Sequence, residues 1–236
     1  MRRVYKMNIV IATIKPWNIE YANQFKRKYG DRYQIHIITD RKDLTYNVLE
    51  KIQPQYVFFP HWSWIIPEKI HQDFDCIVFH MTDLPFGRGG SPLQNLIVRG
   101  LENTKLSALK VDSGMDTGDI YLKEDLNLNG TAEEIFIRAA DLIFTKMIPT
   151  ILEIQPIARK QAGEITNFIR RKPEESQLYP DMKLTQLYDQ IRMLDADGYP
   201  KAFIEFGKYK LVLSRASLKH GKVIADVEIV EEGHDE

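Results

Sequence analysis

Two side chains in this sequence have the chemistry and the local setting for proton transfer. His80 ends the apolar run 76–80, and a segment rich in Pro and Gly follows at 84–90. Asp116 lies between two glycines in a second turn-forming segment. An imidazole exchanges protons at neutral pH, and a neighbouring carboxylate orients the ring and stabilises its charged form. Together the two residue types indicate a general base and its acidic partner.

Both residues also have purely structural interpretations. A histidine at a strand end is commonly a packing residue, and Asp beside Gly commonly forms an ordinary turn. The position of His80 at the carboxyl end of an apolar strand favours chemistry, because ligands bind at that edge of open α/β sheets. We therefore predict His80 and Asp116 as the catalytic residues.

The elements that must position these residues follow from the pattern of apolar runs. Short β-branched runs alternate with segments of helical spacing, which predicts an α/β fold: a Rossmann-like, mostly parallel sheet with helices on both faces. A capping box at 131–134 opens a long helix over 132–153. The predicted strands are 8–12, 33–38, 56–60, 76–80, 105–111 and 120–128, and shorter helices begin near Pro16, residue 43, Pro67 and Ser91.

The pattern changes after about residue 155. A charged link at 170–175 is followed by an amphipathic helix over 183–194. Three short runs, 202–206, 210–214 and 222–230, are typical of a β-meander with turns near Gly207 and Gly221. We predict an α/β catalytic domain over 1–175 and a small, β-rich C-terminal subdomain over 176–236.

The composition disfavours several classes of protein. Thirty-two basic and 33 acidic residues give a net charge of −1, so no nucleic-acid partner is predicted. The single cysteine, Cys76, lies in an apolar run and is expected to be a buried thiol. No signal segment and no apolar stretch of membrane-spanning length is evident, which predicts a cytoplasmic protein without a membrane partner. No group of His, Cys or carboxylate residues has metal-ligand spacing, so no metal is expected.

Two further segments have residues suited to binding. Trp62 and Trp64 follow a predicted strand, where they would form either a stacking wall for a flat heterocycle or a packed loop. Arg88 would either bind an anionic group in a bidentate manner or remain a solvated loop residue. The segment 84–90 is rich in glycine but lacks the Gly-Lys-Ser/Thr ending of a phosphate-binding loop.

These motifs resemble the formyltransferase superfamily that uses 10-formyltetrahydrofolate. The family motif is Asn-x-His-x-Ser-Leu-Leu-Pro-x-x-x-Gly followed by an Asp-x-Gly turn; His80, Leu84, Pro85, Gly89 and Asp116 match it over a resemblance that covers residues 8–175. The resemblance implies that His80 is the base, that Asp116 is its partner and that 10-formyltetrahydrofolate is the formyl donor. The cofactor-binding residues that it implies are Phe59, Trp62, Trp64, Thr82, Leu84, Pro85 and Asp112.

One position departs from the family. The family places an asparagine two residues before the histidine, where this chain has Val78. That asparagine helps hold the oxyanion of the tetrahedral intermediate, a role worth about 2.7–4 kcal/mol in other acyl-transfer sites. Ser63, His61, Asn95 and backbone N–H groups of the glycine loop are the candidate replacements. Without a replacement, the chain would be a catalytically impaired module that binds folate or a nucleotide.

Within the family, the segment 79–95 is most similar to the sugar N-formyltransferases of surface-glycan biosynthesis and to the formylation domain of linear gramicidin synthetase. The resemblance therefore implies a nucleotide-linked amino sugar as the acceptor, in a pseudaminic-acid-type pathway, and is compatible with a homodimer. Arg88, Gly89, Tyr199 and Phe203 are the predicted substrate contacts. The alternative is a methionyl-tRNA formyltransferase-like enzyme, which the short C-terminal region and the near-zero net charge disfavour.

Overall fold

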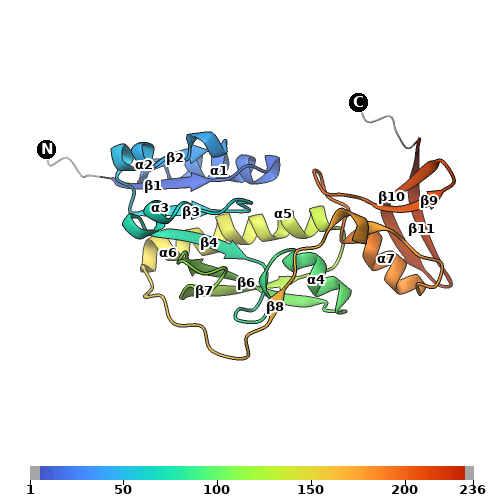
Figure 1. The fold of residues 1–236 in the computed structure, drawn as a ribbon. Helices are drawn as coiled ribbons and strands as arrows, with labels where there is room; N and C mark the ends of the chain where they lie inside the picture. Colours follow the sequence, from blue (N-terminus) through green and yellow to red (C-terminus); the bar gives the residue numbers. More distant parts are fainter. Residues whose placement is uncertain (1–5, 232–236) are drawn as a thin grey trace, which may run out of the picture. The chain divides into compact units, whose positions relative to one another are not determined.

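A six-stranded sheet organises most of the chain (Figure 1). The computed structural model describes residues 6–231. The strands follow the order β2-β1-β3-β4-β6-β7; β4 is parallel to β3 and antiparallel to β6. Their bounds are β1 Met7–Ala12, β2 Tyr33–Ile38, β3 Tyr56–Phe59, β4 Cys76–His80, β6 Asn103–Lys110 and β7 Ile120–Asn127. The short strands β5 Arg88–Gly89 and β8 Asn167–Phe168 pair with each other. The predicted sheet, mostly parallel, is confirmed.

Helices pack on both faces of this sheet because the central strands are apolar on both sides. These helices of the first unit are α1 Pro16–Tyr29, α2 Tyr46–Ile52, α3 Glu68–Asp73, the later part of α5 Ala132–Leu142, and α6 Ile148–Ile154. Helices α4 Pro92–Val98 and α7 Leu184–Arg192 belong to the second unit, which is described below. Val10 of β1 shares one buried cluster with Leu49 of α2 and Ile70 of α3. Ile9 and Ile11 alternate with Val10 along the strand, so they face the opposite side, and both are fully buried.

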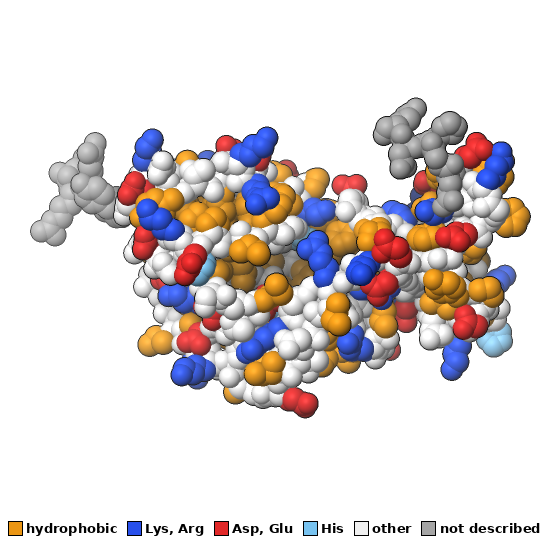
Figure 2. Space-filling view, viewed as in Figure 1, with side chains coloured by type: hydrophobic (Ala, Val, Ile, Leu, Met, Phe, Trp, Pro, Cys, Tyr) orange, Lys and Arg blue, Asp and Glu red, His pale blue; other side chains and the backbone are white. Residues whose placement is uncertain are grey.

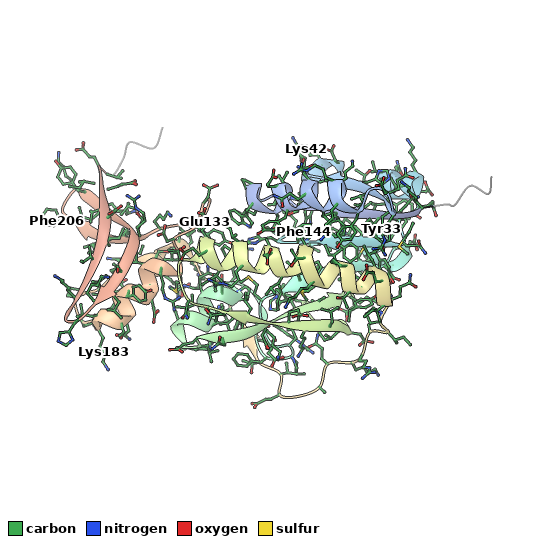
Figure 3. All side chains as sticks on the ribbon, turned by 180° about the vertical axis from the view of Figure 1, so that it is seen from behind. Tyr33, Lys42, Glu133, Phe144, Lys183 and Phe206 are labelled. Atoms are coloured by element: carbon green, nitrogen blue, oxygen red, sulfur yellow. The ribbon has the colours of Figure 1, made fainter. Side chains whose placement is uncertain are left out.

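The helix predicted over 132–153 is interrupted rather than continuous. A π-helical turn over Ile143–Met147 joins α5 to α6. Pro149 follows in the first turn of α6; since it has no N–H, the regular i to i−4 hydrogen bond is missing there and the helix locally widens. Phe144 of this turn stacks on Tyr21 of α1 with ring centroids 5.9 Å apart (Figure 3). The turn thus lacks one backbone hydrogen bond but contributes an aromatic packing contact.

The chain forms two compact units that interleave along the sequence. The first unit contains residues up to Arg88, 105–126 and 137–167, and the second contains 89–104, 127–136 and the residues from 168 on. Each unit is thus assembled from several stretches of chain. The predicted boundary after residue 175 concerns parts that fold separately, and it stays a prediction.

The second unit contains the predicted β-meander. Strands β9 Ala202–Phe206, β10 Tyr209–Lys219 and β11 Lys222–Glu231 form an antiparallel sheet, with left-handed glycines at both turns, Gly207 and Gly221. Helix α7 is fixed to the rest of this unit by Arg192, whose Nη1 donates to the carbonyl oxygens of Leu128 and Gly130 at 2.6 and 3.0 Å. Over residues 6–231, no helix combines the length and the apolar character that a membrane crossing requires.

We predict that replacing Ile11 by Ala lowers the free energy of unfolding by about 2–5 kcal/mol, because the change leaves a cavity in a fully packed strand. Chemical denaturation at neutral pH measures this loss. Ile157→Ala is the matched control: Ile157 is 87% exposed, so its truncation should change stability by less than about 0.5 kcal/mol. Equal losses in the two variants would contradict the burial described for β1.

Candidate active site

His80 lies at the carboxyl end of β4 and is 8% exposed. Its Nε2 is 2.8 Å from the carbonyl oxygen of Gly87, and its Nδ1 is 3.5 Å from Oδ2 of Asp116. A carbonyl and a carboxylate only accept hydrogen bonds. A neutral imidazole has one N–H and serves one of these acceptors, whereas the imidazolium donates to both. The arrangement therefore suits a ring that takes up and releases a proton.

Asp116 is held in a tight turn between β6 and β7. Its backbone is left-handed, with φ of 54°, a region that non-glycine residues populate rarely. A Cβ atom at Gly118 would collide with the carbonyl oxygen of Lys110, so only glycine fits there. Asp112, a predicted cofactor residue, accepts hydrogen bonds from Gly114 N at 3.0 Å and Thr117 Oγ1 at 2.6 Å. Its side chain thus stabilises the turn, and a cofactor contact stays a prediction.

Gln161 joins this turn to the loop after β4, and no sequence motif predicts its role. Its Nε2 donates to the carbonyl oxygens of Asp116 and Gly118 at 2.8 and 2.9 Å. Its Oε1 accepts from Nε and Nη2 of Arg88 at 3.1 and 2.8 Å. The segment around Gln161 has no helical or strand periodicity, so no pattern distinguishes this residue from other loop polar residues. The Arg88 guanidinium binds the amide oxygen of Gln161 through two N–H groups. The predicted contact of Arg88 with a substrate anion stays a prediction.

The loop after β4 is fixed by polar contacts on several sides. Thr82 Oγ1 donates to the Gly87 carbonyl at 3.3 Å, and Ser107 Oγ donates to the Thr82 carbonyl at 2.7 Å. Lys123 Nζ lies 2.5 Å from both Asp83 Oδ1 and the carbonyl oxygen of Leu84. The predicted cofactor residues Thr82, Leu84 and Pro85 are buried in this loop. These three residues pack the loop after β4 where it lies beside His80.

The aromatic segment after β3 divides between core and surface. Phe59 is 1% exposed and belongs to the core cluster against which Trp62 packs. Trp64 contacts Trp62 edge-on at 5.1 Å between centroids, and the Arg41 guanidinium lies 5.6 Å from the centroid of the Trp64 ring. Trp64 also lines a hollow of about 590 Å³. Of the three aromatic residues predicted to contact the cofactor, Trp64 has the most open setting.

The candidates for the missing oxyanion donor have different surroundings. Ser63 is exposed, four residues after the end of β3, the strand beside β4. His61 also follows β3; burial and, to a smaller extent, the Lys15 charge lower its pKa to about 4, so it is neutral at pH 7. Asn95 donates through Nδ2 to the carbonyl oxygens of Gly90, Ser91 and Ile169 at 3.0–3.1 Å, which commits its amide protons. Val78 packs against the core cluster.

Three predicted substrate residues lie in the second unit. Gly89 has φ of 105°, and the Phe168 carbonyl oxygen leaves no room for a Cβ there. Tyr199 stacks on Phe136 at 5.1 Å, and burial raises the pKa of its hydroxyl to about 12. The ammonium of Lys210 lies 4.4 Å from the centroid of the Phe203 ring. These contacts are structural, and the predicted roles in substrate binding stay predictions.

A second hollow, of about 570 Å³, adjoins the loop of His80 within the first unit. Its lining includes Leu84, Tyr121, Lys123, Arg159 and Gln161. Its size falls within the range of small-molecule sites, about 300–1,000 Å³. Among residues 6–231, no three His, Cys, Asp or Glu side chains are grouped as a metal site would require.

Comparison with known proteins gives the family. The solved structure of methionyl-tRNA formyltransferase from Clostridium thermocellum is 60% identical, with a TM-score of 0.94 over 95% of this chain and 99% of that chain. The family model for the C-terminal domain of methionyl-tRNA formyltransferase matches residues 173–230. The chain belongs to the methionyl-tRNA formyltransferase family.

More distant relatives agree in part. The methionyl-tRNA formyltransferase of Rickettsia prowazekii is 36% identical over 132 residues, which are 53% of this chain and 44% of that protein. The chain thus spans less than half the length of this curated relative. The structure of HypX from Aquifex aeolicus in complex with tetrahydrofolic acid shares the fold, at 13% identity and a TM-score of 0.72, over 90% of this chain and 38% of that chain.

The predicted sugar acceptor, and with it the absence of a nucleic-acid partner, is wrong. The sequence relatives are methionyl-tRNA formyltransferases, whereas a sugar N-formyltransferase from Shewanella is 14% identical (TM-score 0.70; 91% of this chain, 99% of that chain) and shares only the fold. Two arguments against a tRNA substrate were wrong. The near-zero net charge is a sum over the whole surface and does not exclude a local nucleic-acid site. The C-terminal region was judged too short, yet residues 173–230 match the family's C-terminal domain.

We predict that acid destabilises the protein partly through His61. Its pKa is about 4 when folded and about 6.5 when unfolded. The unfolded chain therefore binds more protons between these values, and stability falls as the pH drops from about 6.5 to about 4. The loss at about pH 4.5 amounts to about 2–3 kcal/mol.

Denaturation of the protein and of His61→Asn at pH 7 and at about pH 4.5 tests this effect. Asparagine tolerates the left-handed backbone of His61, whose φ is 53°. The variant should lose less stability on acidification than the parent protein. Equal losses in both proteins would rule out the assigned state of His61.

Proposed function

We propose that this chain transfers a formyl group from 10-formyltetrahydrofolate to the amino group of methionyl-tRNA. One observation carries the proposal: Asp116 lies 3.5 Å from the buried His80 at the carboxyl end of β4, in a chain 60% identical to a methionyl-tRNA formyltransferase along nearly its whole length. The family resemblance of the two motifs supports the same donor, as does the tetrahydrofolate complex of HypX, a protein of the same fold.

The donor fits the residues beside His80. The hollow lined by Leu84 and Tyr121 has apolar contact for a heterocycle. Lys123 and Arg159 also line it and suit the carboxylates of the folate's glutamate. When bound, 10-formyltetrahydrofolate supplies the electrophilic formyl carbon.

His80 carries the proton in the proposed reaction. The amine of methionyl-tRNA, as the free base, forms a new C–N bond to the formyl carbon. The imidazole of His80 accepts the proton that the nitrogen loses. Asp116 stabilises the imidazolium from the Nδ1 side. His80 then returns the proton to the folate nitrogen as the bond from that nitrogen to the formyl carbon breaks, which leaves N-formylmethionyl-tRNA and tetrahydrofolate.

Binding of the tRNA would rely on local groups of cations. Acidic and basic side chains are mixed on the face drawn in Figure 2, with no field of a single sign. The exposed Lys219 and Lys222 flank the turn between β10 and β11, within the part that matches the family's C-terminal domain. Phosphate contacts from such residues weaken with salt.

The experiment incubates the protein with 10-formyltetrahydrofolate and methionyl-tRNA. We expect N-formylmethionyl-tRNA and tetrahydrofolate in equal amounts. His80→Ala should lower kcat by about 10²–10⁴-fold, since general acid–base catalysis contributes about that much. His71→Ala, a histidine of α3, is the control and should keep the parent rate.

Two results would contradict the proposal. If the parent protein formylates no methionyl-tRNA while it binds the folate, the assigned reaction is wrong. If His80→Ala turns over at the parent rate, the reaction stands and the role of His80 is wrong.

A further inference from the structure

Gln161 closes a ring of contacts around the catalytic histidine. The ring runs from His80 to the carbonyl of Gly87, along the chain to Arg88, through the side chain of Gln161 to Asp116 and back to His80. All five residues belong to the first unit. Both acceptors of the imidazole are thereby tied to the same amide: Asp116 directly, and Gly87 through its neighbour Arg88.

The orientation of the Gln161 amide is determined by its partners. The Arg88 guanidinium only donates, and it meets Oε1 with two N–H groups, at 3.1 and 2.8 Å. The carbonyl oxygens of Asp116 and Gly118 only accept, and they meet Nε2 at 2.8 and 2.9 Å. Rotating the amide by half a turn would place donor against donor and acceptor against acceptor. A side chain of this length that accepts at one atom and donates at the other is required, and among the natural residues glutamine meets that requirement.

The contact also addresses a strained part of the site. A non-glycine residue with a positive φ persists only where its surroundings over-determine it, and Asp116 has φ of 54°. The two hydrogen bonds from Gln161 hold the turn at the carbonyl of this strained residue and at that of Gly118, two residues further on. Gln161 itself is anchored, because Arg159, two residues before it, pairs with Ile120 of β7 through backbone hydrogen bonds of 2.8 and 2.9 Å.

We propose that Gln161 is a positioning residue that sets the separation of His80 and Asp116 and thereby the rate of proton transfer. The expected effect on the rate rests on the proposed function. The expected effect on the geometry of His80 and Asp116 rests on the ring of contacts alone. Gln161 acts through Arg88 and Asp116 and needs no contact with the reacting atoms.

Two substitutions test the proposal from opposite sides. Gln161→Met keeps the length and removes all four hydrogen bonds. Gln161→Glu keeps the acceptor for Arg88 but sets an oxygen against the two carbonyls of the turn. Both should lower kcat by about 10- to 100-fold, the effect of misplacing catalytic groups by up to about 1 Å, with the KM values for both substrates changed less than about threefold. Arg88→Lys, which keeps one donor, should lose less than either.

A matched control tests whether the effect depends on where the glutamine is replaced. Gln24 lies on the exposed surface of α1, where its amide donates to Glu20 at 3.0 Å. Gln24→Met makes the same chemical change away from the ring and should leave kcat unchanged.

A double-mutant cycle distinguishes positioning from general stabilisation. If Gln161 acts through Asp116, then Gln161→Met added to Asp116→Asn should lower kcat by less than about threefold more, because interacting sites are not additive. Multiplied losses in the double variant would overturn the proposal, as would a Gln161→Met enzyme with the parent kcat.

Nitrogen-15 NMR of the histidine rings gives a readout without any substrate. In the ligand-free protein, the ring nitrogen signals of His80 should move in Gln161→Met toward their positions in Asp116→Asn, and should stay in place in Gln24→Met. This outcome supports the positioning role even if the protein proves to formylate no methionyl-tRNA, so failure of the proposed function is distinguishable. Unmoved His80 signals in Gln161→Met would overturn the inference.

Discussion

His80 meets one hydrogen-bond acceptor on each side of its ring, the Gly87 carbonyl at 2.8 Å and the Asp116 carboxylate at 3.5 Å. A buried polar group without partners is costly, so these acceptors keep the ring in place. The Gly87 carbonyl is fixed by the loop after β4 and by the hydroxyl of Thr82. The carboxylate is fixed by a turn that glycine alone permits at position 118. Much of the local structure around β4 therefore holds these two acceptors at their distances from the His80 ring.

The sheet sets the larger frame for this interaction. Strand β4 lies between β3 and β6, and its first residues, Cys76 and Ile77, are fully buried. Burial raises the pKa of the Cys76 thiol to about 12, which leaves an unreactive packing residue at the start of the strand. The packed beginning and the polar end of one five-residue strand therefore have separate tasks. The first fixes the strand, and the second carries the chemistry.

The sequence predicts well whatever depends on neighbours along the chain. The apolar runs located the six strands, and the capping box of Thr131 and Glu134 forms with reciprocal hydrogen bonds of 2.8 and 3.2 Å. Features that depend on distant partners were missed. Gln161 is 45 residues from Asp116, in a segment without periodicity. The π-helical turn over Ile143–Met147 was also missed, although Pro149 lies within the expected helix. The sugar acceptor was inferred from the likeness of residues 79–95 to sugar N-formyltransferases, and relatives with higher identity along the chain overturn it. Net charge could not correct this inference, because it averages over the whole surface.

The interleaving of the two units has a consequence for how the chain can be divided. Gln94 donates to the Met193 carbonyl at 3.0 Å, and Arg192 donates to the carbonyls of Leu128 and Gly130, so helix α7 shares its unit with segments far upstream. A cut after residue 175 would separate these partners and leave buried carbonyl oxygens without donors. Any change in helix α7 or at its end therefore also alters the hydrogen-bond partners of Gln94, Leu128 and Gly130, which lie far upstream in the chain.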